Sequence, residues 1–221
     1  MTYSASTLLE LMRERIAVNI DLHRKMLGDE CLQQTLLDIA MEVVQSLRKE
    51  GKVLLFGNGG SAADAQHLAA EFTGRYLRER HALPALALNA NTSAITAIGN
   101  DYGFEWVFAR QVEALGRRGD VCVGITTSGN SPNVLRGLQV AKSKSMITVA
   151  MTGSCGGMAF QIADYAIRVP SSETPRIQEC HILAGHMICE IVEQVLCSKP
   201  ECQCDGESRV SVQELQKTVL D

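Results

Sequence analysis

One stretch, residues 52–76 (KVLLFGNGGSAADAQHLAAEFTGRY), constrains the fold of this chain more than any other. Residues 52–56 form a short apolar run with Val and Leu, which is typical of a strand covered on both faces. Gly57–Gly60 breaks that pattern, and an alanine-rich helix follows with Ser61 as its expected N-cap. The stretch therefore predicts a buried strand, a tight turn and a helix, which is the repeating unit of an α/β fold.

The turn and the helix after it carry groups suited to a phosphorylated ligand. Glycines let the backbone approach a ligand closely, and the free N–H groups of a helix start favour an anion. His67 and Glu71 are spaced i, i+4, so both side chains project from one face. A turn that binds nothing, beside an ordinary ion pair, fits the same pattern. The turn only half meets the dinucleotide fingerprint, and we expect no nucleotide cofactor.

Length and composition restrict the class of protein further. The chain has 221 residues and a net charge of −4, which indicates one domain with appendages and no nucleic-acid partner. Its apolar runs fall far short of the roughly 20 residues that a membrane span needs, and no signal pattern opens the chain. The eight cysteines are scattered, which favours reduced thiols. We therefore expect a cytoplasmic protein without a membrane partner.

Strands and helices alternate along the rest of the chain, which predicts a parallel sheet wound by right-handed crossovers. The expected strands are residues 83–88, 121–126, 146–151 and 165–169, and the expected helices are residues 93–98, 105–115, 132–144 and 176–196. Two helices precede them, at 6–27 and 30–50, with Gly28 as an αL-type stop and Asp29 as a cap. This pair serves either a subunit interface or added packing within the domain.

A second loop, residues 126–131 (TTSGNS), repeats the arrangement of the first. It lies between a strand and a helix that has Pro132 at its first position. Four hydroxyls and free helix N–H groups make a phosphate cradle that needs no lysine, although a long capping loop fits as well. Ligands of open parallel sheets bind outside the carboxyl ends of the strands, so the two loops together indicate one site.

The last helix and the tail carry the remaining candidates. Gln178 and His186 lie two turns apart and can share a face, while a core histidine is the alternative interpretation. The polar tail, residues 198–221, continues a series of cysteines at 197, 202 and 204 that has no standard zinc spacing. We expect this tail to be mobile, although residues 210–220 could form a short helix.

With both loops and the last helix in view, the chain resembles the phosphoheptose isomerases of the SIS, or sugar isomerase, family. The matching segments are residues 57–76, 95–112, 119–135 (GDVCVGITTSGNSPNVL) and 168–190 (RVPSSETPRIQECHILAGHMICE). The resemblance implies an α/β, flavodoxin-like sheet of five parallel strands sandwiched by helices, the SIS fold. It implies a helical pair at 1–50 for oligomerisation, an SIS domain at 51–197, and a homotetramer with active sites between subunits.

The same resemblance assigns roles to residues. Glu71 and His186 fall on the family's acid/base pair, and a zinc site falls on His67, Glu71, Gln178 and His186. Gln is an unusual zinc ligand, so the affinity for the metal is expected to be modest. The residues implied to bind substrate are Asn58, Gly59, Gly60, Ser61, Glu71, Asn100, Asp101, Thr126, Thr127, Ser128, Ser131 and Gln178.

The activity implied is the conversion of sedoheptulose 7-phosphate to D-glycero-D-manno-heptose 7-phosphate through an enediol. This is the first step towards the activated heptoses of bacterial surface glycans such as lipopolysaccharide. Three alternatives stay open: a non-catalytic SIS adaptor for a protein partner, a sugar-phosphate-sensing module, and a different phosphosugar isomerase. The adaptors resemble the enzyme but lack the set formed by His67, Glu71 and His186, which favours the enzyme.

Overall fold

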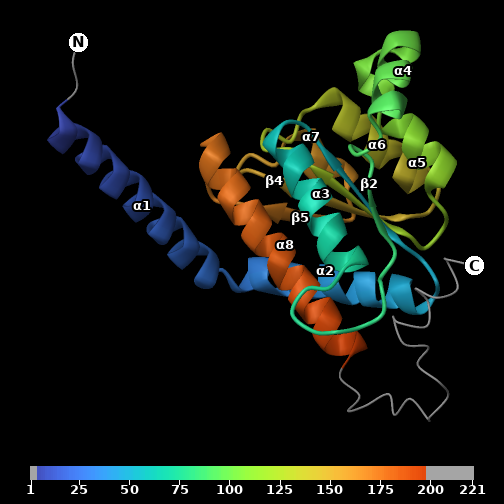
Figure 1. Ribbon diagram of the computed structural model, residues 1–221, viewed down its shortest axis with the longest axis horizontal. Helices are drawn as coiled ribbons and strands as arrows, with labels where there is room; N and C mark the ends of the chain where they lie inside the picture. The colour runs from blue at the N-terminus through green and yellow to red at the C-terminus, as the bar shows by residue number, and fades with distance from the viewer. Residues whose placement is uncertain (1–3, 198–221) are drawn as a thin grey trace, which may run out of the picture.

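A five-stranded, all-parallel sheet with helices on both faces forms the body of the molecule (Figure 1). The structure is a computed structural model and describes residues 4–197. The strands are β1 (Val53–Gly57), β2 (Ala85–Ala87), β3 (Val121–Ile125), β4 (Ile147–Thr152) and β5 (Tyr165–Arg168). Their order, β2-β1-β3-β4-β5, is that of the flavodoxin-like fold and confirms the predicted class.

The helices divide into two layers around this sheet. They are α1 (Ala5–Leu27), α2 (Glu30–Arg48), α3 (Gly60–Thr73), α4 (Thr92–Tyr102), α5 (Ala109–Leu115), α6 (Pro132–Ser143), α7 (Gly157–Ile162) and α8 (Thr174–Leu196). A 3-10 turn, η1 (Phe104–Trp106), precedes α5. Helices α2, α3 and α8 share one hydrophobic core with Val53 and Leu55 of β1, and α5 and α6 share the other with Leu54 and Phe56. Both faces of β1 are thus covered, which explains its continuous apolar sequence.

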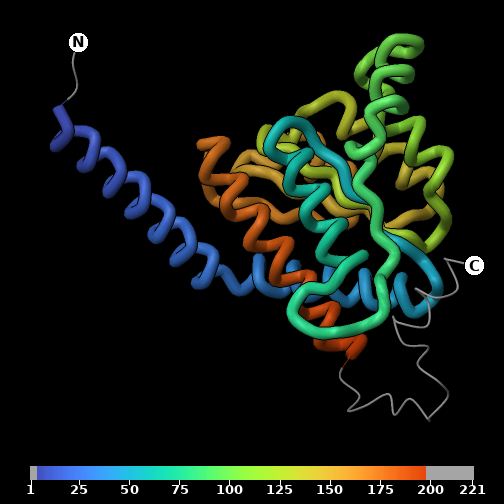
Figure 2. The backbone as a smooth tube through the Cα atoms, viewed as in Figure 1, coloured from blue at the N-terminus to red at the C-terminus, as the bar shows by residue number. Residues whose placement is uncertain are grey.

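The two N-terminal helices lie in different surroundings. Helix α2 packs on α8 and β5 and contributes Leu36, Ile39 and Val43 to the core. Helix α1 extends away from the body, as the blue end of the tube shows (Figure 2). The predicted boundary at residue 50 and the oligomerisation role stay predictions, and the tail predicted to be mobile lies outside the described residues. No helix within residues 4–197 is long and apolar enough to cross a membrane.

Several predicted element ends are wrong, for local reasons. Gly28 has φ −87° and is not αL; the break after α1 comes from Asp29, whose side chain accepts a hydrogen bond from the N–H of Leu32 at 2.9 Å. Ser61 is not the N-cap of α3, because the helix already begins at Gly60. Gly59 holds the cap position with φ +56°, a conformation that favours glycine.

Helix α4 is longer than predicted and runs through Gly99 to Tyr102. An interior glycine costs a helix only about 1 kcal/mol, which did not suffice to end this one. Asn100 and Asp101, which follow the helix predicted at 93–98, are therefore helical. The helix predicted at 105–115 is divided into η1 and α5, β2 has only three residues, and α8 begins at Thr174 rather than at Arg176.

Candidate active site

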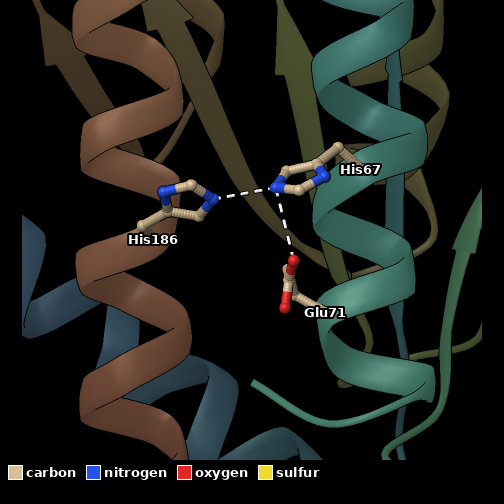
Figure 3. Close-up of side chains that lie close together, drawn as sticks. All are labelled: His67, Glu71 and His186. Atoms are coloured by element: carbon tan, nitrogen blue, oxygen red, sulfur yellow. Dashed lines mark hydrogen bonds and ion pairs between the residues drawn. The ribbon is translucent and has the colours of Figure 1, made fainter. Parts of the chain in front are cut away.

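Helices α3 and α8 lie side by side and bring three polar side chains together (Figure 3). Nε2 of His67 is 2.8 Å from Nε2 of His186, so one ring donates a hydrogen bond and the other accepts it. The same Nε2 of His67 is 3.3 Å from Oε1 of Glu71, one turn further along α3. His67 is exposed, whereas Glu71 and His186 are half-buried. Two imidazoles and one carboxylate thus lie close together at the surface. They come from α3 and α8, which are far apart in the sequence.

This group fits a metal ion such as zinc. Nitrogen or oxygen atoms of His67, Glu71 and His186 all lie within 4.8 Å of one another. Two imidazoles and one carboxylate are an established donor set for zinc, and three protein ligands leave one coordination position open for water or substrate. The donor chemistry therefore agrees with three of the four ligands that the sequence resemblance implies.

Gln178, the fourth implied ligand, contacts the start of α3. A methyl group added to Gly60 would lie 2.4 Å from Nε2 of Gln178, so only glycine leaves room for this amide. Gly60 precedes His67 by seven residues, or about 10 Å along the helix axis. Gln178 precedes His186 by eight residues on α8. The contact of Gln178 with Gly60 and the contact of His186 with His67 therefore lie at two levels along the same two helices. The structure places Gln178 beside the glycine turn, and its role as a metal ligand stays a prediction.

The two loops predicted to bind the substrate lie next to each other at the carboxyl ends of β1 and β3. Their link is a reciprocal pair of amide hydrogen bonds between Asn58 and Asn133, at 2.9 and 2.8 Å. Asn133 is buried, which makes this link a fixed part of the fold. Asn58 and Ser131 both line a cleft of about 550 Å³ that Arg136 and η1 complete. Gly59 forms the turn, and Gly60 and the buried Ser61 are the first two residues of α3.

The hydroxyls of the second loop are partly engaged with one another. Oγ1 of Thr126 is 3.0 Å from Oγ of Ser131 and 3.4 Å from Oγ of Ser128. Thr126 is buried, Thr127 and Ser131 are half-buried, and Ser128 is exposed. These side chains lie at the N-terminus of α6, which begins with a proline that has no N–H. The N–H of Val134 already donates a hydrogen bond to Oδ1 of Asn133 at 2.9 Å. Phosphate binding would replace the hydroxyl contacts within this group by contacts with its oxygens.

Asn100 and Asp101 lie apart from the His67 group. Both are exposed on α4, and Nδ2 of Asn100 donates a hydrogen bond to Oδ1 of Asp101 at 2.8 Å. Within the part of the chain that the structure describes, no hydrogen bond or ion pair joins them to His67, Glu71 or His186. Figure 1 shows α4 at the outer end of the molecule. One copy of the chain thus does not join all the predicted substrate-binding residues.

Two residues near the site had not been predicted from the sequence. The ring of Tyr76 lies 5.6 Å from the ring of His186, centroid to centroid. Asp64 lies one turn before His67, and its Oδ2 is buried without a hydrogen-bond partner among the described residues. Burial raises the pKa of Asp64, against the opposing effect of His67. Its i, i+3 spacing from His67 is a signal that the sequence contains, whereas Tyr76 follows α3 with no such pattern.

Comparison with known proteins identifies the family of this chain. The model of the SIS domain family matches residues 28–153. The phosphoheptose isomerase of Aquifex aeolicus is 57% identical over 170 residues, which are 77% of this chain and 89% of that protein. The structure of the phosphoheptose isomerase from Neisseria gonorrhoeae has a TM-score of 0.80 and 44% identity, covering 85% of this chain and all of that one. The corresponding structure from Francisella tularensis has a TM-score of 0.81 and 37% identity over 85% of this chain and 99% of that one.

The chain therefore belongs to the SIS domain family, and its relatives place it among the phosphoheptose isomerases. The predicted resemblance is confirmed, and with it the prediction that the chain is an enzyme of the aldose–ketose isomerase class.

Proposed function

We propose that this enzyme converts sedoheptulose 7-phosphate to D-glycero-D-manno-heptose 7-phosphate. The observation that carries the proposal is the convergence of His67, Glu71 and His186 between α3 and α8. A carboxylate and an imidazole are the groups that a ketose–aldose conversion requires, because one proton moves between carbons and another between oxygens. Relatives named phosphoheptose isomerase support a heptose phosphate as the substrate.

In the proposed mechanism Glu71 moves the carbon-bound proton. Its carboxylate removes a proton from C1 of the ketose, and the C1–H electron pair forms the double bond of a cis-enediol. The protonated carboxyl then returns a proton to C2, which leaves the carbonyl at C1. Glu71 is half-buried and is oriented by the ring of His67, 3.3 Å away. Its side chain is only 21% exposed, which limits proton exchange with water and favours return of the proton to the substrate.

His186 moves the second proton in this proposal. Its imidazole gives a proton to O2 as the enediol forms and accepts the proton of O1 as the aldehyde forms, so that no net proton is lost. The neighbouring ring of Tyr76, tilted by 36° at 5.6 Å, and the hydrogen bond to His67 fix the orientation of His186. Zinc, when bound by His67, Glu71, Gln178 and His186, would supply a Lewis acid for the carbonyl oxygen. Glu71 would then have to shift from the metal to act as the base.

The remaining predicted residues bind and orient the substrate in this proposal. Thr126, Thr127, Ser128 and Ser131 hold the phosphate, while Asn58 with the glycine turn lines the sugar. Asn100 and Asp101 bind hydroxyls of a sugar held by another subunit of a homotetramer. Their distance from the His67 group within one chain supports this arrangement. We place the reaction in the cytoplasm, with heptose-containing surface glycans such as lipopolysaccharide as its use.

The Glu71→Gln variant tests the proposal. The amide keeps the volume of the side chain but cannot accept the carbon-bound proton, so kcat is expected to fall by about 10²–10⁴-fold. The fold should persist, which circular dichroism and thermal unfolding will check. Glu113→Gln changes an exposed carboxylate on α5 in the same way and is the matched control. Full activity of Glu71→Gln would contradict the assigned role.

A non-catalytic adaptor is the second candidate. It would bind a protein partner and show no turnover, and it would be indifferent to Glu71. The intact set of His67, Glu71 and His186 speaks against it. An isomerase for another sugar phosphate would turn over its own substrate faster than sedoheptulose 7-phosphate, and a comparison of kcat/KM values between candidate sugars decides between the two.

A further inference from the structure

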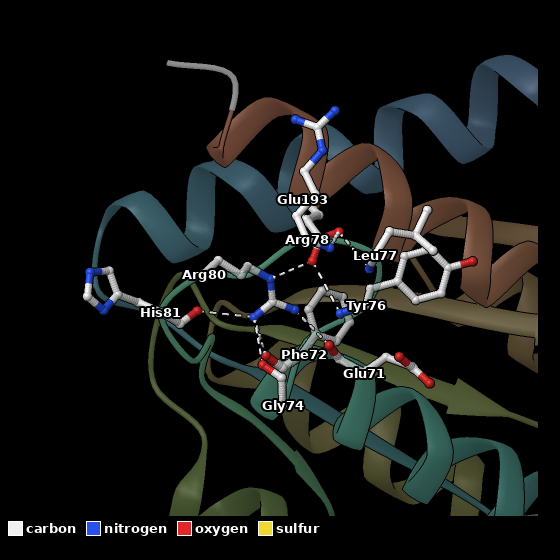
Figure 4. Close-up of polar contacts among 9 residues, drawn as sticks. All are labelled: Glu71, Phe72, Gly74, Tyr76, Leu77, Arg78, Arg80, His81 and Glu193. Atoms are coloured by element: carbon white, nitrogen blue, oxygen red, sulfur yellow. Dashed lines mark hydrogen bonds and ion pairs between the residues drawn. The ribbon is translucent and has the colours of Figure 1, made fainter. Parts of the chain in front are cut away.

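A buried ion pair lies behind the catalytic group, at the far end of α3 and α8 (Figure 4). Glu193 of α8 and Arg80, from the segment after α3, are 2.9 Å apart between Oε1 and Nε. Their side chains are only 2% and 5% exposed. Burial of a charged pair is expensive, and it persists only where further hydrogen bonds satisfy both partners. Nothing in the proposed mechanism uses either residue directly.

Glu193 holds the segment that follows α3 by its backbone. Its Oε1 accepts a hydrogen bond from the N–H of Tyr76 at 3.2 Å, and Oε2 accepts from the N–H groups of Leu77 and Arg78 at 2.8 Å each. Burial alone would raise the pKa of Glu193, but these three bonds and the one from Arg80 outweigh it, so the pKa is lowered. The carboxylate is therefore charged at neutral pH, and each of its oxygens accepts two hydrogen bonds.

Arg80 holds the end of α3 in turn. Nη2 donates a hydrogen bond to the backbone oxygen of Glu71 at 2.7 Å, and Nη1 donates to the backbone oxygen of Phe72 at 2.9 Å. The same Nη1 reaches the oxygens of Gly74 and His81 at 3.2 and 3.1 Å. The last carbonyls of a helix have no partner within the helix, and the planar guanidinium satisfies several of them at once.

The ion pair thus contacts Glu71 directly and reaches His186 through one intervening residue, Tyr76. Arg80 bonds the backbone of Glu71 itself. Glu193 bonds the backbone of Tyr76, whose ring lies beside the ring of His186. From these contacts we infer that Glu193 and Arg80 are positioning residues that set the relative placement of Glu71 and His186. The inference rests on the proposed function for the roles of those two residues, but the contacts exist independently of it.

Two variants with a matched control test this inference. Glu193→Gln replaces one of the two acceptor oxygens by an NH2 donor. This donor faces backbone N–H groups, so the segment carrying Tyr76 must shift. Asp120→Asn is the control: Asp120 is equally buried, pairs with Lys52 at 2.6 Å and accepts bonds from the N–H groups of Lys52 and Arg117. It lies directly before β3, and among the described residues no hydrogen bond or ion pair joins it to Glu71, Tyr76 or His186. Arg80→Lys keeps the charge but loses the planar fork.

We expect kcat to respond differently in variants of the two ion pairs. Loss of a residue that orients a functional group typically lowers activity or metal affinity 10–100-fold. We expect kcat to fall by about this factor in Glu193→Gln and in Arg80→Lys, with KM changed less than about threefold, and kcat to be kept in Asp120→Asn. Equal losses of kcat in Glu193→Gln and Asp120→Asn, at equal losses of thermal stability, would overturn the inference.

A spectroscopic measurement separates this inference from the proposed function. The ring resonances of His186 report the neighbouring ring of Tyr76 and can be followed at fixed pH in histidine-labelled full-length protein. The Tyr76→Leu variant defines their position without that ring. We expect them to move towards that position in Glu193→Gln and to stay in Asp120→Asn. Unmoved resonances in Glu193→Gln would refute the inference, and this holds even if the chain does not turn over sedoheptulose 7-phosphate.

Discussion

Two histidines of α8 differ in what surrounds them. His186 reaches the surface beside His67, whereas His181 is fully buried and its Nε2 lies 3.1 Å from the backbone oxygen of Thr152. Nδ1 of His181 has no hydrogen-bond partner within residues 4–197. Burial lowers the pKa of His181 to about 4, although the bond to Thr152 opposes this. His181 is therefore a neutral core residue, as expected of a histidine on an apolar helix, and its titration couples to folding.

The free energy of unfolding should depend on the protonation of His181. The pKa in the folded state lies below the ordinary value of 6.5, so the unfolded state binds the proton more tightly. Stability from this residue is complete above pH 6.5 and is lost as the pH falls towards 4, by about 3 kcal/mol at most. Urea unfolding at several pH values should show a weaker pH dependence in His181→Gln. If the free energy of unfolding changed with pH equally in the wild type and in His181→Gln, this prediction would be wrong.

Sequence patterns predicted the contacts of single residues only where the partners were close in sequence. The i, i+4 spacing of His67 and Glu71 predicted a shared face, which the 3.3 Å contact bears out. The same spacing rule says nothing about Arg80 and Glu193, which are 113 residues apart and meet only because α3 and α8 pack together. Long-range polar contacts of this kind leave no local signal in the sequence and could not be predicted from it.

At the scale of elements, the packing of α3 on α8 determines the site. The two helices approach closely at Gly60 and again at Gly185, where an added methyl group would meet the side chain of Leu68 at 2.5 Å. Strands and most helices could be predicted because their apolar periodicity is strong. Ends of elements could not, because apolar periodicity does not show that Gly59 caps α3 with φ +56° or that α4 continues through Gly99.

Gly60→Ala should displace Gln178 and little else. The clashing atoms belong to the far end of a flexible side chain, so the melting temperature is expected to stay within a few degrees of the wild-type value. Activity should fall about tenfold, because Gln178 is proposed to bind substrate and metal. Steady-state kinetics and thermal unfolding measure both effects. Gly28→Ala, whose added methyl group would meet two backbone oxygens at ordinary contact distances of 3.6 and 3.8 Å, is the control. Unchanged kinetics in Gly60→Ala would exclude a role for Gln178.

At the scale of the whole molecule, α1 is the element whose apolar surface the single chain leaves exposed. Along this helix Leu8, Met12, Ile16 and Ile20 recur every four residues and are 46–61% exposed. A contiguous exposed apolar stripe of this kind marks an interaction surface. Polar contacts near Arg15, which lies 3.4 Å from Glu173, attach α1 to the start of α8, so the stripe has a fixed direction. These features support the proposed homotetramer.

Ile16→Glu should weaken the proposed assembly without unfolding the subunit. Ile16 is 60% exposed in the single chain, so a charge there costs the isolated fold little. In an apolar interface the same charge would be buried without a partner, which is strongly unfavourable. Light scattering should show smaller species than for the wild type, whereas Ala17→Glu, on an exposed position off the stripe, should not change the mass. An unchanged mass of Ile16→Glu would exclude the α1 stripe as the interface.

The central claim is that this molecule isomerises sedoheptulose 7-phosphate at the site formed by His67, Glu71 and His186. The most direct test incubates the purified full-length protein with this sugar and follows aldose formation, first as prepared, then after chelation and after zinc is added back. We predict aldose formation that falls on chelation and returns with zinc. Activity that survives thorough chelation would leave Glu71 and His186 as a metal-free acid/base pair. No aldose under any of these conditions would contradict the claim.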